Sequence, residues 1–290
     1  MSWLRIVVDA NRDEGPVVEQ ALEQHGAVSI SFEDRADEPV FELKPGDTPL
    51  WSETRITGLF PADAPAAIIL EHVEQALGHV LLDSRVEKLA DQDWERVWLE
   101  RFKPTLVGAN LWICPTHMSA PDSEAVTVFI DPGLAFGSGT HPTTAMCLDW
   151  LSRQDLGSRD VIDYGCGSGI LAIAALKLGA QSAWGTDIDP RALEVATANA
   201  ATNGVGDRLL TCLPEALPEQ QFDVLVANIL SAPLISLVDT FNNLLKPNGR
   251  IALSGILESQ TEEVAAAYEP YFELQAKQQD GWTLLSGARV

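Results

Sequence analysis

A glycine-rich turn between an apolar segment and a helical segment carries the clearest chemistry in this sequence. Residues 161–171 read VIDYGCGSGIL, with glycines at Gly165, Gly167 and Gly169. Glycine lets the backbone adopt positive φ angles and approach a ligand closely, and the first N–H groups of a helix are free to donate. A turn of this kind at the carboxyl end of a strand is typical of a site for a nucleotide-like cofactor.

The spacing of these glycines separates two classes of cofactor. The dinucleotide fingerprint is GxGxxG, whereas the pattern here is GxGxG and Ile170 stands where that fingerprint has its third glycine. Asp163 precedes the glycines, and a carboxylate suits a cofactor with a cationic amino-acid end better than one with a pyrophosphate. We therefore predict that Asp163, Gly165, Gly167 and Gly169 bind a cofactor of the cationic kind.

An acidic residue follows at the distance expected for sugar binding. Asp187 ends a predicted strand 22 residues after Gly165, and an acid about 20 residues beyond the turn can accept hydrogen bonds from the ribose hydroxyls. Asp189 is better placed to cap the next helix, with Pro190 at its first position. We predict that Asp187 binds the ribose, that Ile188 lies beside it in the cofactor site, and that Asp189 is a helix cap.

A polar amide follows another predicted strand at the same edge of the sheet. Residues 222–227 form a buried strand and Asn228 comes directly after it. The amide carbonyl can accept a hydrogen bond from an amine; the alternative role is that of a helix cap or turn residue. Beside the glycine turn and Asp187, Asn228 is predicted to position a reacting amine and to contact the cofactor.

A loop with three glycines precedes the glycine-rich turn. Residues 131–144 read DPGLAFGSGTHPTT, and a mobile loop in this place can close over a bound ligand. Phe136 is the candidate catalytic residue of this loop. His141 is a lone loop histidine, which is more often structural, and we assign it no catalytic role. Cofactor contacts are predicted from Gly137, Thr143 and Thr144.

From about residue 151 on, apolar segments alternate regularly with helical ones. This βαβα alternation predicts a parallel sheet with helices on both faces. The last two strands enclose Gln279-Asp280-Gly281, and Asp-Gly between strands is a hairpin signal. The predicted strands are 160–164, 183–187, 208–212, 222–227, 250–254, 271–278 and 282–288, and the predicted helices are 144–151, 170–178, 190–203, 232–245 and 258–268.

The first 90 residues show a different order of elements. Strands are predicted at 3–8, 27–32, 53–60 and 80–89, and helices at 14–25 and at 65–77, the latter opened by Asp63 and closed by Gly78. The order βαββαβ predicts a small α+β domain of the ferredoxin-like type. No chemistry is visible in this segment, so it is interpreted as a docking module.

A tryptophan-rich segment joins the two parts. Trp94, Trp98 and Phe102 recur every four residues and would share one face of a helix. That face is either the packing side of a connecting helix or, alternatively, an aromatic substrate surface. Two further strands are predicted at 111–114 and 126–130. The predicted division is therefore a docking domain at 1–90, a linker helix at 91–104 and a cofactor-binding domain at 105–290.

Composition and charge narrow the class of protein. The net charge is −23, and acids exceed bases in both parts of the chain. Such a field repels phosphate backbones and attracts a basic protein, although acidity can also serve solubility alone. The four cysteines form no CxxC pair, so neither a metal site nor a disulfide framework is expected. No apolar run is long enough to span a membrane and no signal peptide is evident, which predicts a cytoplasmic protein.

With these residues in place, the C-terminal part resembles the seven-stranded Rossmann-like methyltransferases, and nearly the whole chain resembles the ribosomal protein L11 methyltransferase family. This resemblance implies an α/β fold: a Rossmann-like seven-stranded sheet, parallel with a C-terminal antiparallel hairpin, preceded by the docking domain and a linker. The segments that carry it are WSETRITGLF, DWERVWLERFKPTLVGANLWICP, DPGLAFGSGTHPTT, DYGCGSGILAIAALKLGA, GTDIDPRALEVATANAATN, NIL and SGILESQ.

The resemblance also implies an activity. Members of this family transfer methyl groups from S-adenosylmethionine to lysine side chains and the N-terminal amine of ribosomal protein L11, so the implied partner is a basic large-subunit ribosomal protein, free or on the ribosome. The chain departs from the family at Ser138, where threonine is frequent, and at Tyr164, where a smaller apolar residue is common. The family's cofactor positions carry over onto Thr144, Gly165, Asp187 and Asn228.

Several other functions remain as alternatives. The missing third glycine and the C-terminal hairpin disfavour a nicotinamide-dependent oxidoreductase, and the intact glycine turn and Asp187 disfavour a non-catalytic adaptor. A methyltransferase acting on another protein is also compatible with these motifs. Glutamine methylation usually accompanies Asn-Pro-Pro-Tyr, whereas residues 228–230 read NIL. The negative charge disfavours direct, sequence-specific binding of nucleic acid.

Overall fold

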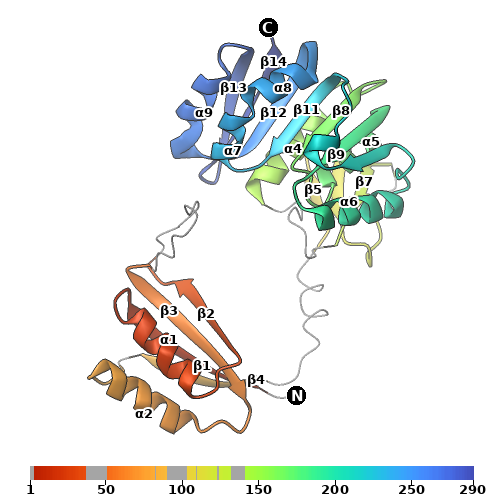
Figure 1. Ribbon diagram of the computed structural model, residues 1–290. Helices are drawn as coiled ribbons and strands as arrows, with labels where there is room; N and C mark the ends of the chain where they lie inside the picture. Colours follow the sequence, from red (N-terminus) through yellow and green to blue (C-terminus); the bar gives the residue numbers. More distant parts are fainter. Residues whose placement is uncertain are drawn as a thin grey trace. The chain divides into compact units, whose positions relative to one another are not determined.

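The computed structural model describes residues 3–36, 51–81, 83–89, 103–108, 110–122, 124–131 and 141–290. The chain separates into two compact units, Met1–Val97 and Trp98–Val290 (Figure 1). The predicted linker helix with Trp94, Trp98 and Phe102 lies outside the described residues, as do Phe136, Gly137 and Ser138. The predicted boundaries at 90 and 104 therefore stay predictions.

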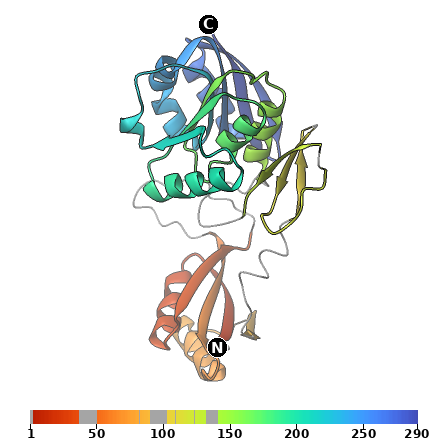
Figure 2. The ribbon, with the colours of Figure 1, turned by 90° about the vertical axis from the view of Figure 1, so that its right-hand side faces the viewer.

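The first unit is a four-stranded antiparallel sheet covered by two helices on one face (Figures 1 and 2). Alternate residues of its central strand, Leu4, Ile6 and Val8, are buried against the helices, as the period of two along a strand requires. Its strands pair in the order β2-β3-β1-β4. Its elements are β1 (Trp3–Asn11), α1 (Gly15–Gln24), β2 (Ser29–Asp34), β3 (Glu53–Pro61), α2 (Ala66–Leu77) and β4 (Ser84–Leu89).

The order of these elements is the predicted βαββαβ, while the ferredoxin-like assignment stays a prediction. Two details differ from the sequence prediction. Helix α2 begins after Pro65 with no side-chain cap, so Asp63 does not open it, although Gly78 ends it in the left-handed conformation as expected. Strand β4 starts at Ser84 rather than at residue 80, so the predicted strand was too long at its start.

The second unit is built on a seven-stranded sheet with the strand order β10-β9-β8-β11-β12-β14-β13. Strands β8 to β12 run parallel, whereas β14 is antiparallel to both β12 and β13. The strand order reverses between β8 and β11, which is where open parallel sheets bind ligands. The strands are β8 (Asp160–Tyr164), β9 (Ser182–Thr186), β10 (Leu209–Cys212), β11 (Phe222–Asn228), β12 (Leu245–Leu257), β13 (Phe272–Gln279) and β14 (Trp282–Arg289).

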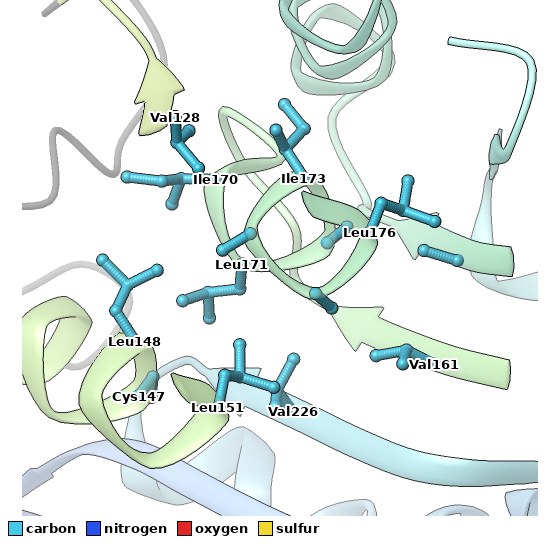
Figure 3. Packing of buried hydrophobic residues seen from close by; sticks show 14 of the residues in the cluster. Val128, Cys147, Leu148, Leu151, Val161, Ile170, Leu171, Ile173, Leu176 and Val226 are labelled. Carbon is cyan, nitrogen blue, oxygen red and sulfur yellow. The ribbon is translucent and has the colours of Figure 1, made fainter. Parts of the chain in front are cut away.

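Helices cover both faces of this sheet, as predicted. On β8, Val161 packs into one hydrophobic cluster, whereas Ile162 and Tyr164 pack into the cluster on the other face. Figure 3 shows the first cluster, where Leu148 and Leu171 from two helices meet the strand residues. The helices are α4 (Pro142–Ser152), α5 (Ile170–Lys177), α6 (Pro190–Thr202), α7 (Ser231–Ser236), α8 (Val238–Leu244) and α9 (Thr261–Tyr268).

The C-terminal hairpin confirms the interpretation of Asp280-Gly281. Both residues have positive φ angles, +51° and +79°, which a two-residue type I′ turn requires. The segment predicted as one helix over 232–245 is instead two helices, α7 and α8, that meet at Leu237. Leu234 of α7 and Phe241 of α8 both pack into the core on the same face of the sheet.

A small three-stranded sheet precedes α4 and lies beside the large one (yellow-green in Figure 2). It consists of β5 (Thr105–Val107), β6 (Leu111–Cys114) and β7 (Val126–Phe129), of which β5 was not predicted because three residues carry too little periodicity. The Asn203 side chain ties β7 to the end of α6, since it accepts from the N–H of Phe129 and donates to its carbonyl, both at 2.7 Å.

We predict that Tyr268→Phe lowers the free energy of unfolding by about 1 to 2 kcal/mol, because the buried Tyr268 hydroxyl donates to the carbonyl of Leu234 at 2.8 Å and thereby joins α9 to α7. Tyr271→Phe is the matched control. Its hydroxyl is exposed and bonds Asp239, so we expect a change under about 0.5 kcal/mol. Urea unfolding of both variants measures the difference, and equal losses would contradict the prediction.

Among the described residues, no helix is both long enough and apolar enough to cross a membrane.

Candidate functional site

A cavity of about 810 Å³ opens at the carboxyl ends of β8 and β11, where the strand order reverses. Its size is that of a site for a small molecule or cofactor. Five of the predicted site residues line it: Thr143, Thr144, Gly165, Gly167 and Asn228. The other described residues that line it are His141, Pro142, Cys166, Ile170, Leu171, Ile229, Leu230, Gly255 and Trp282.

The glycine-rich turn forms one wall of this cavity. Gly165, Gly167 and Gly169 all have positive φ angles, of +80°, +51° and +77°, so a side chain at any of them would strain the backbone. The N–H groups of Gly165 and Cys166 both donate to the carbonyl of Thr186, at 2.7 and 3.0 Å. This pair of bonds joins the end of β8 to the end of β9 and holds the turn in place.

Gly169 lies at the far end of the turn and does not line the cavity. It is the N-cap of α5, and a Cβ there would stand 2.9 Å from the Cβ of Ala196. This glycine therefore allows α5 and α6 to approach each other, which is a packing role. Its predicted contact with the cofactor stays a prediction.

We expect Gly165→Ala to cost about 2 to 4 kcal/mol of stability, because it combines a positive φ with a Cβ placed 2.3 Å from Cγ2 of Ile229. Gly204→Ala is the control, since Gly204 has a φ of +69° but no atom within 4 Å of the added Cβ. That control should lose only about 1 kcal/mol. Thermal unfolding compares the two, and a loss at Gly165 no larger than at Gly204 would contradict the prediction.

Asp187 lies directly after β9 and bonds the glycine turn, although it is not among the described residues that line the cavity. One carboxylate oxygen accepts from the N–H of Gly167 at 2.9 Å and the other from the N–H of Asp189 at 3.0 Å. A carboxylate can accept about four hydrogen bonds, so acceptor sites remain for two ribose hydroxyls. Asp189 accepts from the N–H of Arg191 at 2.9 Å, which confirms it as the N-cap of α6. Ile188, between them, is 85% exposed.

Asn228 and Thr144 both line the cavity and are joined by a hydrogen bond. The Asn228 amide nitrogen donates to the Thr144 hydroxyl at 3.1 Å, and Thr144 is itself buried within the first turn of α4. This bond orients the amide of Asn228. Its carbonyl oxygen is thus left as the acceptor that a substrate amine can use.

His141 has a structural role in this region. It is the N-cap of α4 and accepts from the N–H of Thr143 at 3.4 Å, so this helix starts at Pro142 rather than at Thr144 as predicted. Burial lowers the pKa of His141, which favours the neutral ring that can act as an acceptor. The ring also packs edge-on against Trp282, with 5.0 Å between centroids.

Asp163 occupies a different place from the predicted one. We predicted that this carboxylate meets the cationic end of the cofactor, but Asp163 is fully buried and does not line the cavity. Its Oδ2 accepts from the N–H of Ala172 at 3.1 Å, whereas its Oδ1 has no hydrogen-bond partner among the described residues. Burial raises the pKa of Asp163 to about 7, and the neighbouring charge of Asp187 acts in the same direction.

These residues fit an adenosyl cofactor with a positive charge. Asp187 beside the glycine turn keeps acceptor capacity for sugar hydroxyls, and the buried Oδ1 of Asp163 has no partner among the described residues. The described lining residues include no lysine or arginine, so none of them would repel a positively charged group. Among all residues that the structure describes, no three or more histidine, cysteine, aspartate or glutamate side chains cluster as potential metal ligands.

Trp282 and Gly255 line the cavity but were not predicted from the sequence. Trp282 starts β14 opposite Leu257 of β12, so only the antiparallel end of the sheet brings it to the site. Gly255 has a φ of +83°, and a Cβ there would stand 2.2 Å from the carbonyl oxygen of Ile229. The predicted strand ended at residue 254, whereas the structure continues β12 through Gly255 to Leu257.

Comparison with known proteins decides the family. The model of one family, described as "Ribosomal protein L11 methyltransferase (PrmA)", matches residues 2–290. The chain belongs to the ribosomal protein L11 methyltransferase family. The L11 methyltransferase of Pseudomonas aeruginosa (strain LESB58) is 50% identical over 291 residues, covering 100% of this chain and 99% of that protein. That of Azotobacter vinelandii (strain DJ / ATCC BAA-1303) is 49% identical over 291 residues and covers 100% of both chains.

A solved structure confirms the predicted fold class of this methyltransferase. The crystal structure of the ribosomal protein L11 methylase from Lactobacillus delbrueckii subsp. bulgaricus matches with a TM-score of 0.60 at 33% sequence identity. The match covers 65% of this chain and 99% of that one. The predicted family and the seven-stranded sheet with its antiparallel end are thereby confirmed.

Proposed function

We propose that this chain transfers methyl groups from S-adenosylmethionine to amino groups of ribosomal protein L11, at lysine side chains and at the N-terminal amine. The observation that carries the proposal is the pairing of Asn228 with Thr144 at a cavity that the glycine turn lines, with Asp187 bonded to that turn at Gly167. This pairing orients the Asn228 carbonyl oxygen as a hydrogen-bond acceptor for a substrate amine, next to a site that suits a positively charged adenosyl cofactor. Relatives that span the full chain are named as methyltransferases of ribosomal protein L11, which indicates the acceptor protein.

When bound, S-adenosylmethionine would supply an electrophilic methyl group on a positively charged sulfur. On this proposal, Asp187 accepts hydrogen bonds from the ribose hydroxyls, and Gly165 and Gly167 leave space for the cofactor to approach the backbone. The other proposed cofactor contacts come from Gly169 and Asn228, from Thr143 and Thr144, from Ile188, and from Gly137 in the loop before α4. Phe136 of the same loop is the proposed neighbour of the acceptor amine.

The chain must present the amine in its neutral form. A lysine in water has a pKa near 10.4, so it must lose a proton before its lone pair can attack. The apolar lining from Ile229, Leu230 and Trp282 disfavours the ammonium form. The Asn228 carbonyl then accepts from one amine N–H and turns the lone pair toward the methyl group, which is a positioning effect.

The proton leaves to water on this proposal. None of the described lining residues is a carboxylate, and His141, the one imidazole among them, already accepts a hydrogen bond within its own helix cap. A dedicated base is therefore not part of the mechanism that these residues support. The lysine ammonium loses one proton to water and reacts as a neutral amine. The methylated product is formed as an ammonium, and it then loses a second proton to solvent.

We further propose that the acidic surface favours a basic protein partner. The net charge of −23 attracts a basic ribosomal protein and repels bare phosphate backbones, which argues against direct, sequence-specific contact with nucleic acid. The N-terminal unit is the proposed docking domain. The proposed reaction takes place in the cytoplasm, on L11 that is either free or assembled into the large subunit.

The test is methylation with a labelled methyl donor of purified ribosomal protein L11, large ribosomal subunits and protein-free ribosomal RNA in parallel. We expect label on L11 alone, and mass spectrometry should place it on lysines and the N-terminal amine. The Asn228→Ala chain controls for contaminating enzymes. Label confined to RNA, or to another protein of the subunit, would refute the proposed substrate.

A further inference from the structure

We propose that Asp163 is a charge sensor behind the donor site, which holds a proton when no cationic sulfur is bound and releases it when the sulfonium of S-adenosylmethionine binds. This inference rests on the proposed function. It adds a device by which the chain distinguishes the methyl donor from the demethylated product, S-adenosylhomocysteine, whose sulfur carries no charge.

The Asp163 carboxyl group lies close to the lining of the cavity. Asp163 precedes Gly165 by two residues, and its hydrogen-bond partner Ala172 directly follows Leu171. Both Gly165 and Leu171 line the cavity, as does Cys166, whose thiol is near enough to be affected by the Asp163 charge. The carboxyl group itself does not line the cavity and is fully shielded from solvent.

The contacts of Asp163 leave its charge incompletely compensated. Oδ2 accepts from Ala172 in the first turn of α5, where the helix dipole also favours a negative charge. Oδ1 has no partner among the described residues, and a buried anionic oxygen without a partner is costly. Protonation relieves that cost, whereas a cation on the other side of the wall would compensate the anion instead.

None of the described groups that face Asp163 is a cation. Asp187, after β9, adds a second negative charge that disfavours ionisation. Cys147 of α4 and Cys166 of the turn are close enough to sense the Asp163 charge, and burial raises the pKa of both thiols, so they stay neutral. Burial raises the pKa of Asp163 to about 7, and only the Ala172 N–H acts in the opposite direction.

The direction of the pH dependence follows from this arrangement. A cation bound beside the wall lowers the pKa of Asp163, so the donor prefers the chain with Asp163 deprotonated. Donor affinity therefore rises as the pH increases toward 7 and then levels off. The product carries the same amino-acid end but no sulfonium, so its affinity should change less. The ratio of product to donor dissociation constants should increase about tenfold between about pH 6 and about pH 8.

Isothermal titration calorimetry with each compound, in two buffers of different ionisation enthalpy, measures both affinity and released protons. We expect S-adenosylmethionine to release more protons than S-adenosylhomocysteine at neutral pH. Asp163→Asn keeps an acceptor for Ala172 but cannot titrate, so it should abolish the difference. Asp160→Asn, at the opposite end of β8 where Asp160 accepts from Ser182 and pairs with Lys246, should retain it.

The outcomes separate the inference from the proposed function. Equal proton release and equal pH dependence for the two compounds in the unaltered chain would overturn the sensor and leave the methyl transfer intact. Failure of both compounds to bind would overturn the proposed function and the sensor together. Because the unaltered chain gives the decisive comparison, a folding defect of Asp163→Asn would not prevent the test.

Discussion

Asn228→Ala should lower kcat for methylation of L11 by about 100-fold or more, while the dissociation constant for S-adenosylmethionine changes only a few-fold. The reason is that the Asn228 carbonyl is the acceptor left free by the bond from its amide nitrogen to Thr144. Without it, the amine reaches the site with no fixed direction for its lone pair. Single-turnover kinetics and binding calorimetry measure the two quantities separately.

Thr144→Val is the matched change on the other partner. It removes the hydroxyl that orients the Asn228 amide but keeps the side-chain shape within α4. We expect an intermediate loss of kcat, and a double variant no slower than Asn228→Ala alone, since both changes remove one interaction. Full activity of Asn228→Ala would show that the amide does not position the amine.

Asp187→Ala should weaken S-adenosylmethionine binding by about 100-fold or more, because each charge-assisted hydrogen bond to the ribose contributes about 1.5 to 3 kcal/mol. Part of the loss would come from the glycine turn, since Asp187 also holds the N–H of Gly167. Asp187→Asn separates the loss of ribose binding from the loss of support for the glycine turn. The amide keeps one acceptor oxygen for the Gly167 N–H but carries no charge.

Asp189→Ala is the control for a nearby acid. Asp189 caps α6 through the N–H of Arg191, so its loss should cost about 1 kcal/mol of stability with little change in cofactor affinity. Calorimetry and thermal unfolding distinguish the two acids. If Asp189→Ala weakened the donor as much as Asp187→Ala, the division of roles between them would be wrong.

The parallel sheet was predictable because its central strands, β8 and β11, are buried on both faces and are bounded by turn residues. In β8, for example, the consecutive residues Val161 and Ile162 pack into the two hydrophobic clusters on opposite faces of the sheet. The Asp280-Gly281 turn was predictable because so few residues tolerate two consecutive positive φ angles. In both cases the decisive signal is local in the sequence.

The features that escaped prediction depend on tertiary contacts. The break between α7 and α8 falls at Leu237, where no glycine marks it in the sequence. Trp282 reaches the cavity through the pairing of β14 with β12. Asp163 was interpreted as a ligand-facing acid because it stands beside the glycines, but both faces of β8 are covered, so its side chain is buried in the interior.

The same contrast applies to the site as a whole. The glycine turn, Asp187 and Asn228 follow different strands of one parallel sheet, so their meeting at one edge was predictable from the alternation of elements. The hydrogen bond between Asn228 and Thr144 joins residues 84 positions apart in the chain. Nothing in the local sequence of either residue indicates the other.

A crystal structure with S-adenosylhomocysteine bound tests the central claim most directly. We predict that the adenosyl group occupies the cavity beside Gly165 and Gly167, with both ribose hydroxyls within hydrogen-bond distance of the Asp187 carboxylate. The sulfur should then point toward the amide of Asn228. A ligand bound elsewhere on the chain, or a ribose with no contact to Asp187, would contradict the account.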